Sequence, residues 1–320
     1  MGLFTTVTLD EAHALGAEYG LDIRAVEPLQ AGSVNSNFRV VDAAGNHFFA
    51  RIYEEQAAAG AVVELRLLSE LWRVDVPVTV PLQRRDGSWV ASFRGKPYAM
   101  YPWVEGELLC RAMVTPAHCG AVGAALGKLH AATPWVTPLP AGRFRVEDLF
   151  ARLDRVDRES PEHRADAARI RERLSHYVGL RNPDAPAGVV HGDLFRDNVF
   201  FRGESVLALI DFESASHGVF AFDVMVTALA WCYGAAFERD QVAAFFAGYE
   251  AARPFLPGER ENLLVEGAIA CLRFATTRIT DFSMRAEPGK PPLRDYRRFL
   301  GRLDALEAGV LDELGLKDRP

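Results

Sequence analysis

In the first fifty or so residues of the chain, short apolar runs alternate with turn-forming residues. Three runs rich in Val, Phe, Ile or Leu have the length of β-strands and lie at 24–29, 37–41 and 47–53. The sequence DAAGN, at 42–46, separates the second run from the third and is typical of a tight turn. The pattern therefore begins with three consecutive strands.

A helical period replaces this alternation in the next segment. Between residues 58 and 74 the apolar positions recur every three or four residues, which predicts a helix with one buried face. Two further predicted strands, 78–83 and 97–101, flank the turn sequence RRDG. The N-terminal part is thus expected to hold five strands, with one helix inserted after the third.

From residue 115 onward the apolar pattern is mostly helical. The predicted helices lie at 115–132, 147–180 with a break near Pro161, 219–233, 238–252, 259–284 and 292–313. The exception is the segment 187–211, where VVHGD, NVFF and SVLALIDF predict short strands joined by tight loops. We therefore expect an α+β fold of two lobes, residues 1–101 and residues 102–320, joined at the sequence MYPWVEGE.

Composition and charge exclude several classes of partner. The chain has 320 residues, 36 Lys and Arg against 43 Asp and Glu, and a net charge of −7, without a dense basic run, so no nucleic-acid partner is expected. The longest apolar stretch, 219–237, is interrupted by Asp223 and Gly234, which favours a buried helix over a membrane span.

The four cysteines and the N-terminal residues indicate the compartment. Cys110, Cys119, Cys232 and Cys271 are far apart and match neither a zinc site nor a disulfide framework, which is typical of a reducing environment. The first residues have no pattern of a secretory signal. We expect a cytoplasmic protein that is a monomer or a homodimer.

The sequence VVHGDLFRDNVFF, residues 189–201, places several polar side chains between two apolar runs. A hairpin formed by NVFF and SVLALID would bring Asp193, Asn198 and Asp211 together. A carboxylate and an amide oxygen from opposite sides of a hairpin suit a hard cation such as Mg²⁺, which completes its shell with phosphates and water. Asp193 would then be available to accept a proton.

These residues also carry a family resemblance. The pattern H-G-D-L-x-x-x-N followed by I-D-F resembles the catalytic loop and metal-binding segment of the aminoglycoside phosphotransferase and choline kinase group, which is similar to the protein kinases. The resemblance implies a protein-kinase-like two-lobe fold. It also implies that Asp193 is the catalytic base or hydroxyl anchor and that Asn198 and Asp211 hold the metal ions at the phosphates of ATP.

The same resemblance assigns supporting residues in both lobes. It implies that His191 braces the catalytic loop and that Asp223 tethers this loop through backbone N–H groups. In the loop LQAGSVNSNF, Gly32 and Ser33 would lie at the phosphates, although a full G-x-G-x-x-G is missing. The adenine would lie near the join of the lobes, between Met100 and Trp103.

The cation of the N-terminal lobe is the main departure from the kinase pattern. Arg51 stands on the third strand where protein kinases have Lys, and its forked guanidinium is not equivalent to an ammonium group. Glu64, on the following helix, is the expected partner of Arg51. An ordinary surface ion pair is the alternative for these two residues.

Several longer phrases, among them GSVNSNFRV, HGDLFRDNVFF and RFATTRITDF, resemble the homoserine kinases built on this fold. Homoserine would need an acid for its ammonium group and a cation for its carboxylate. Glu213 is the candidate acid, and Arg273 and Arg278, five residues apart on one helix, are the candidate cations. The resemblance implies transfer of the γ-phosphoryl of ATP to L-homoserine, a step of threonine biosynthesis.

Two alternatives remain beside homoserine. One is a kinase for another small alcohol, such as an aminoglycoside, choline, ethanolamine or a methylthioribose-like sugar. The other is a non-catalytic kinase-like binding protein, for which the Arg51 substitution is the only argument, since Asp193, Asn198 and Asp211 are all present. A protein kinase is disfavoured because no A-P-E phrase follows Asp211.

Overall fold

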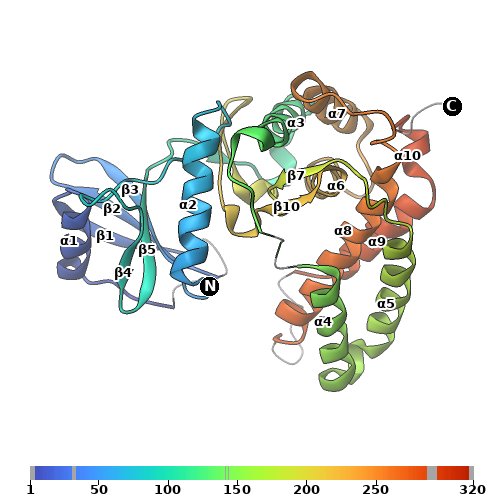
Figure 1. Cartoon of the computed structure of the whole chain (residues 1–320). Helices are drawn as coiled ribbons and strands as arrows, with labels where there is room; N and C mark the ends of the chain where they lie inside the picture. Colours follow the sequence, from blue (N-terminus) through green and yellow to red (C-terminus); the bar gives the residue numbers. More distant parts are fainter. Residues whose placement is uncertain (1–3, 31–33, 141, 143, 287–293, 317–320) are drawn as a thin grey trace.

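The computed structural model describes residues 4–30, 34–140, 142, 144–286 and 294–316. Its N-terminal lobe is built on a five-stranded antiparallel sheet with the order β1-β2-β3-β5-β4. The strands are β1 Ile23–Leu29, β2 Ser36–Asp42, β3 His47–Ile52, β4 Ala91–Phe93 and β5 Lys96–Pro102. Figure 1 shows this lobe beside a larger helical lobe, as the pattern predicted.

Two helices cover the two faces of the sheet. Helix α2 (Ala58–Trp72) follows β3 as predicted and packs on the face that looks toward the helical lobe (Figure 1). Helix α1 (Leu9–Glu18) covers the other face and was not predicted. Its N-terminus carries a capping box, in which Thr8 accepts from the backbone N–H of Glu11 and the Glu11 side chain accepts in return from that of Thr8. That signal was present in the sequence.

The predicted strand at 78–83 is wrong. The fourth strand of the sheet is Ala91–Phe93, which forms a hairpin with β5, while in the predicted segment only Val78 makes an isolated bridge. Pro77 and Pro81 flank and interrupt this segment, and each removes a backbone N–H that a ladder needs. The apolar residues of this segment alone were therefore not enough to predict a strand.

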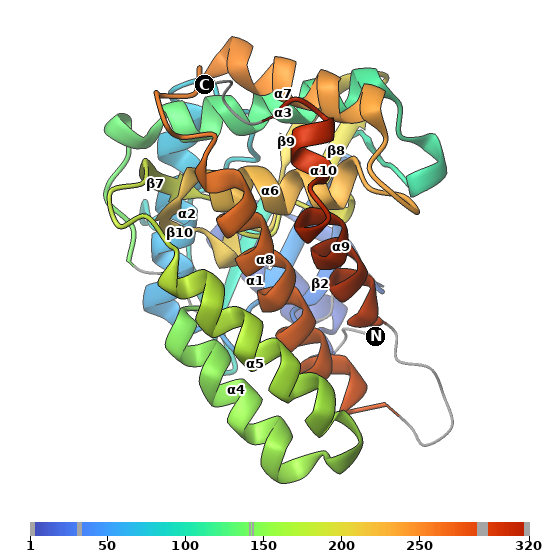
Figure 2. The ribbon, with the colours of Figure 1, turned by 90° about the vertical axis from the view of Figure 1, so that its right-hand side faces the viewer.

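The C-terminal lobe is mainly helical. Its helices are α3 Pro116–Ala131, α4 Val146–Glu159, α5 Arg164–Gly179, α6 Phe220–Trp231, α7 Arg239–Ala252, α8 Asn262–Arg278, α9 Arg297–Glu307 and α10 Val310–Glu313. The predicted helix 147–180 is divided at Pro161 by a short 3-10 turn, and α8 continues into a π turn, Ile279–Ser283. Helix α6 is buried in the middle of this lobe (Figure 2), so the apolar stretch is a core helix as predicted.

Two small sheets carry the segment that the sequence singled out. Strands β7 (Ala187–Val190) and β10 (Ser216–Val219) pair with each other, and β8 (Val199–Arg202) pairs with β6 (Glu107–Leu108) and β9 (Ser205–Leu209). The β8–β9 hairpin is the one predicted from NVFF and SVLALID. It places the segments around Asn198 and Asp211 at the same end of one hairpin.

Helices α3 and α7 lie side by side in an unusually close contact (Figures 1 and 2). Glycines make this approach possible, because a Cβ on Gly123 would lie 2.1 Å from the carbonyl oxygen of Phe245, and one on Gly248 would lie 2.1 Å from that of Gly120. The contact fixes the rows of side chains that face each other along the two helices.

Within the ranges given above, no helix combines the length and the apolar character needed to cross a bilayer.

Candidate active site

The loop after β7 is held by the side chain of Asp223 on α6. The carboxylate of Asp223 accepts from the backbone N–H of His191 at 2.7 Å and from that of Gly192 at 2.8 Å. Gly192 has φ +75°, a conformation that favours glycine. The Nε2 atom of His191 lies 3.0 Å from the carbonyl oxygen of Ile210, which ties the loop to the hairpin. Asp223 and His191 therefore lie where the sequence predicted them, around the backbone of the loop.

Asp193 follows directly and points into a partly exposed space, with a third of its side chain accessible. The guanidinium of Arg273 lies 3.5 Å from its Oδ1 atom. Arg273 is itself buried between the rings of Phe144 and Phe274, at 4.2 and 3.8 Å from their centroids. Burial raises the pKa of Asp193, while the positive charge of Arg273 opposes that rise. A carboxyl group with a raised pKa beside a cation is suited to proton transfer.

Asn198 and Asp211 meet at the base of the β8–β9 hairpin. The Ile210 N–H donates to the carbonyl oxygen of Asn198 at 3.0 Å, so the two residues lie on adjacent chains. The Nδ2 atom of Asn198 donates to the Asp193 carbonyl oxygen at 2.9 Å, which assigns the other side of the amide to Oδ1. Asp211 has φ +66°, a conformation uncommon for a residue other than glycine. The predicted hairpin thus brings the three residues together.

Arg51 connects the N-terminal lobe to this hairpin. Its Nη1 atom donates to Asp211 Oδ1 at 3.1 Å and its Nε atom to Asn37 Oδ1 at 3.2 Å, and its side chain is 11% exposed. Burial lowers the pKa of Arg51, but the carboxylates of Asp211 and Glu64 outweigh that effect and raise it. Arg51 forms an ion pair with Asp211, and the negative charge of Glu64 also acts on it; the direct pairing of Arg51 with Glu64 stays a prediction.

The residues expected around the adenine, Met100 and Trp103, differ in where their side chains lie. Met100 is opposite Ala50 on β3, and its side chain is fully buried in the core under α1, on the face of the sheet opposite Arg51. That the adenine lies near Met100 to Trp103, where the lobes join, stays a prediction. Trp103 lies just beyond β5 and makes an edge contact with His47. The two loop residues, Gly32 and Ser33, lie outside the described residues.

The remaining acceptor candidates, Glu213 and Arg278, come from two different elements. Glu213, in the 3-10 turn Phe212–Ser214 after Asp211, accepts from Nδ2 of Asn35 at 2.5 Å, so it joins the two lobes. Arg278, at the end of α8, donates to the Asp295 carbonyl oxygen at 3.0 Å and lies 4.5 Å from the centroid of Phe299. Burial and the neighbouring arginines lower the pKa of Arg278 to about 10, and the charge of Asp193 opposes this. Arg278 is thus within electrostatic reach of Asp193.

Sequence reasoning missed two residues of this region. Asn35 is almost fully buried and accepts from the Glu54 N–H at 3.2 Å besides donating to Glu213. His130, on α3, has its Nε2 atom 3.2 Å from Asp223. Neither contact has a local sequence signal, because the partners lie 178 and 93 residues apart.

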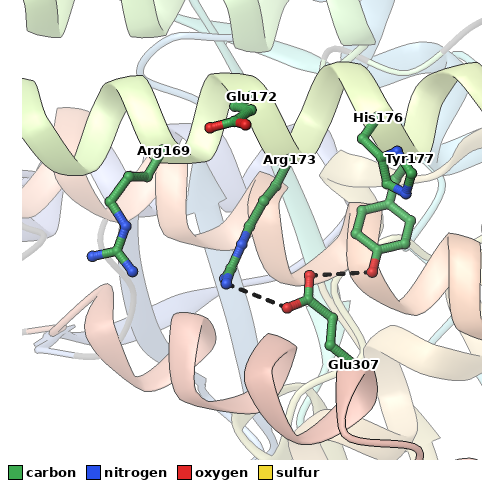
Figure 3. A pocket seen from close by; sticks show the side chains of 6 residues that line it. All are labelled: Arg169, Glu172, Arg173, His176, Tyr177 and Glu307. Carbon is green, nitrogen blue, oxygen red and sulfur yellow. Dashed lines mark hydrogen bonds and ion pairs between the residues drawn. The ribbon is translucent and has the colours of Figure 1, made fainter.

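One surface hollow lies away from this site. A cavity of about 380 Å³ lies between α5 and α9, and its lining residues are Arg169, Glu172, Arg173, His176, Tyr177 and Glu307 (Figure 3). Glu307 accepts from Tyr177 at 3.1 Å and pairs with Arg173 at 3.3 Å, so three of the lining side chains contact each other. This hollow does not include any residue of the candidate site.

Comparisons with known proteins agree with this geometry. The chain is similar to a homoserine kinase of Methylorubrum populi, with 34% identity over 96% of this chain and 98% of the relative, and to a homoserine kinase of Methylobacterium sp. (strain 4-46), with 33% identity over 93% and 95%. Among solved structures, an amicoumacin kinase in complex with AMP-PNP, Ca²⁺ and its ligand superposes with a TM-score of 0.70 at 15% identity, covering 95% of this chain and 94% of that one.

A spectinomycin phosphotransferase in complex with ADP and its ligand superposes with a TM-score of 0.71 at 13% identity, covering 97% of this chain and 100% of that one. These likenesses confirm the α+β, protein-kinase-like fold predicted from the sequence. Residues 25–255 match the model of the phosphotransferase enzyme family, and the chain belongs to this family.

Proposed function

We propose that the chain is an ATP-dependent homoserine kinase whose catalytic residues are Asp193, Asn198 and Asp211. The observation that carries the proposal is the convergence of these three side chains at the β8–β9 hairpin in a chain whose relatives, aligned over nearly their full length, are named homoserine kinases. The nucleotide lobe would comprise residues 1–101 and the acceptor lobe residues 102–320. We also propose that it acts in the cytoplasm, as a monomer or homodimer.

In this reaction the hydroxyl oxygen of the acceptor forms a bond to the γ-phosphorus as the bond to the β–γ bridging oxygen breaks, which releases ADP. Asp193 orients the hydroxyl group and accepts its proton. Its contact with Arg273, at 3.5 Å, holds the carboxylate in place and favours the ionised form that a base requires. Asp193 is partly exposed, as a group that meets a soluble acceptor must be.

The donor set at the hairpin fits Mg²⁺. One carboxylate from Asp211 and one amide oxygen from Asn198 are the hard oxygen ligands that this ion takes when phosphates and water supply the rest of its shell. When bound, the ion would neutralise the charge of the β and γ phosphates. We assign Oδ1 of Asn198 to this role because Nδ2 is fixed on the carbonyl oxygen of Asp193.

Arg51 is the cation that we assign to the phosphates of ATP, with Gly32 and Ser33 in the covering loop and Trp103 near the base. Arg51 already bridges Asn37 of the sheet and Asp211 of the hairpin, so it is positioned at the boundary between the two lobes. Glu64 supports its charge from α2. The forked guanidinium thereby does the work of the strand lysine found in protein kinases.

The two arginines of α8 take different roles in this proposal. Arg273 is engaged with Asp193 and acts on the hydroxyl end of the acceptor. Arg278, whose charge is felt by Asp193 from one turn farther along α8, binds the carboxylate of homoserine. Glu213, held through Oε1 by Asn35, receives the ammonium group. The ammonium and carboxylate groups, which share the α-carbon of homoserine, would then be held together, and the hydroxyl group at the other end of the molecule would be directed at Asp193.

The test is ADP release by the purified protein with ATP and Mg²⁺, over L-homoserine, choline, methylthioribose, kanamycin and a blank without acceptor. We expect turnover with homoserine alone and a product heavier by one phosphoryl group. Asp193→Asn is the control for contaminating kinases. Selective turnover with a different acceptor would keep the phosphotransferase and reject homoserine, whereas absence of turnover with every acceptor would favour a binding protein.

A further inference from the structure

A buried hydrogen-bonded chain extends from the catalytic loop to the far side of α7. His130 approaches Asp223 through Nε2 at 3.2 Å and the hydroxyl group of Tyr249 through Nδ1 at 2.8 Å. Arg253 donates to the same hydroxyl group at 3.0 Å and to the two carboxylate oxygens of Glu259 at 2.9 and 3.1 Å. The chain therefore joins Glu259, in the turn before α8, to the residue that holds the loop.

The direction of every bond in this chain follows from its two ends. The carboxylate of Asp223 is only an acceptor, so a neutral His130 carries its hydrogen on Nε2 and donates it to Asp223. Nδ1 is consequently unprotonated and accepts from the hydroxyl group of Tyr249, whose oxygen accepts from Arg253, a group that only donates. Asp223 then has both oxygens available to accept from the loop backbone. One protonation pattern satisfies all five groups.

Packing isolates this chain from water. His130, Asp223, Tyr249 and Glu259 are buried, and the ring of Phe220 lies between two members, 4.5 Å from the ring of His130 and 4.3 Å from the guanidinium of Arg253. Burial lowers the pKa of His130 and raises that of Tyr249, so both stay neutral, as the bond directions require. Without water, a lost bond has no substitute partner.

We propose that Tyr249 and Arg253 are positioning residues of the phosphotransferase reaction, acting on the backbone of His191 and Gly192 through His130 and Asp223. Tyr249 donates to Nδ1 of His130 and so holds the ring in the orientation that directs Nε2 at Asp223, and Arg253 holds the oxygen of Tyr249 in place. Glu259 holds Arg253 in place and also accepts from the backbone N–H of Leu256 at 2.9 Å. The expected effect on turnover rests on the proposed function. The expected effect on the position of the loop does not.

Tyr249→Phe removes the hydroxyl group and little else. We expect kcat to fall about tenfold, since sub-ångström displacement of a catalytic group has effects of this order, with KM for ATP unchanged within about twofold. Tyr177→Phe is the matched control. Tyr177, like Tyr249, is a buried tyrosine with a hydrogen-bonded hydroxyl group. Its hydroxyl group donates to the carboxylate of Glu307, which connects α5 to α9 and not to the catalytic loop (Figure 3). This control should lower Tm to a similar extent and leave kcat unchanged.

Amide hydrogen exchange supplies a readout that needs no acceptor. In Tyr249→Phe the peptide 189–194 should exchange about tenfold faster than in the parent, and in Tyr177→Phe it should not change. If Tyr249→Phe fails to fold, Glu259→Gln, which keeps the size of the side chain and one acceptor oxygen, takes its place. The double variant Tyr249→Phe with Arg253→Met should lose no more activity than the worse single variant, because both act through His130.

The results separate the two proposals. The positioning role would be overturned if Tyr249→Phe lowered Tm but kept the kcat of the parent protein and its rate of amide exchange at 189–194. A parent protein that does not phosphorylate homoserine would overturn the proposed function, and the exchange comparison would still decide whether Tyr249 controls the loop.

Discussion

Substitution of Arg51 tests how the nucleotide site works without the lysine of protein kinases. Arg51 makes one bond to a carboxylate, Asp211 at 3.1 Å, and one to an amide, Asn37 at 3.2 Å. Both bonds are charge-assisted because the guanidinium is ionised, and a hydrogen bond to a charged group contributes about 1.5 to 3 kcal/mol. The Coulomb energy of the Arg51–Asp211 pair is larger, about 5 kcal/mol at an effective dielectric constant of 20, but Asp211 is one-third exposed and water screens much of it.

These energies give different expectations for two variants. Arg51→Met removes the charge, and if the guanidinium holds a phosphate oxygen as it holds Asp211, KM for ATP should rise about 10-fold to 150-fold. Arg51→Lys keeps the charge near Asp211 and loses the fork that reaches Asn37, so KM for ATP should rise only about 2-fold to 10-fold. The order of the two variants is therefore the sharper expectation.

The assay is the initial rate of ADP release at saturating acceptor with ATP varied, together with calorimetric titration of ATP into each variant. Arg24→Met is the matched control, because Arg24 is an arginine of the same sheet, on β1, that pairs with Asp22 at 2.6 Å and is 64% exposed. Parental KM and kcat in Arg51→Met would refute the assignment of Arg51 to the phosphates. Equal losses in both Arg51 variants would show that the fork, not the charge, is what the site uses.

Three further substitutions test the acceptor side. Asp193→Asn should leave ATP binding almost intact while lowering kcat by about two orders of magnitude or more, measured by titration and by ADP release; unchanged turnover would remove Asp193 from the mechanism. Arg273→Met removes the charge that opposes the rise in the pKa of Asp193, so the acid limb of the kcat profile should move to higher pH; an unmoved limb would mean that the pair is not felt during turnover. Arg278→Met should raise KM for homoserine about tenfold or more with KM for ATP unchanged, and a rise in KM for ATP instead would place Arg278 in the nucleotide site.

Local features of the site were accessible from the sequence. Asp193, Asn198 and Asp211 lie within twenty residues of one another, and a hairpin between two apolar runs is enough to bring them together. The break at Pro161 and the helix after β3 were equally local. Periodicity and turn residues therefore account for the parts of the fold in which neighbours in sequence are neighbours in space.

Contacts between distant segments were not accessible in this way. The pairing of Arg51 with Asp211 spans 160 residues and depends on how the two lobes dock, which no periodicity encodes. The face on which the side chain of Met100 lies depends on a long-range feature as well. The alternation of β5 places Met100 and Tyr101 on opposite faces, but deciding which face carries Arg51 requires the register Arg51–Ala99 between β3 and β5.

The glycines of α3 are a sequence pattern that does predict one contact between distant segments. Gly120, Gly123 and Gly127 recur at intervals of three and four residues, so they form one stripe along the helix. A stripe without side chains lets another helix approach closely, and α7 supplies it, since a Cβ on Gly127 would lie 2.7 Å from the carbonyl oxygen of Tyr249. That close approach brings the Tyr249 hydroxyl group to His130. The small residues of α3 thus matter to the catalytic loop, although none of them touches it, because they set the distance at which Tyr249 meets the histidine that holds Asp223.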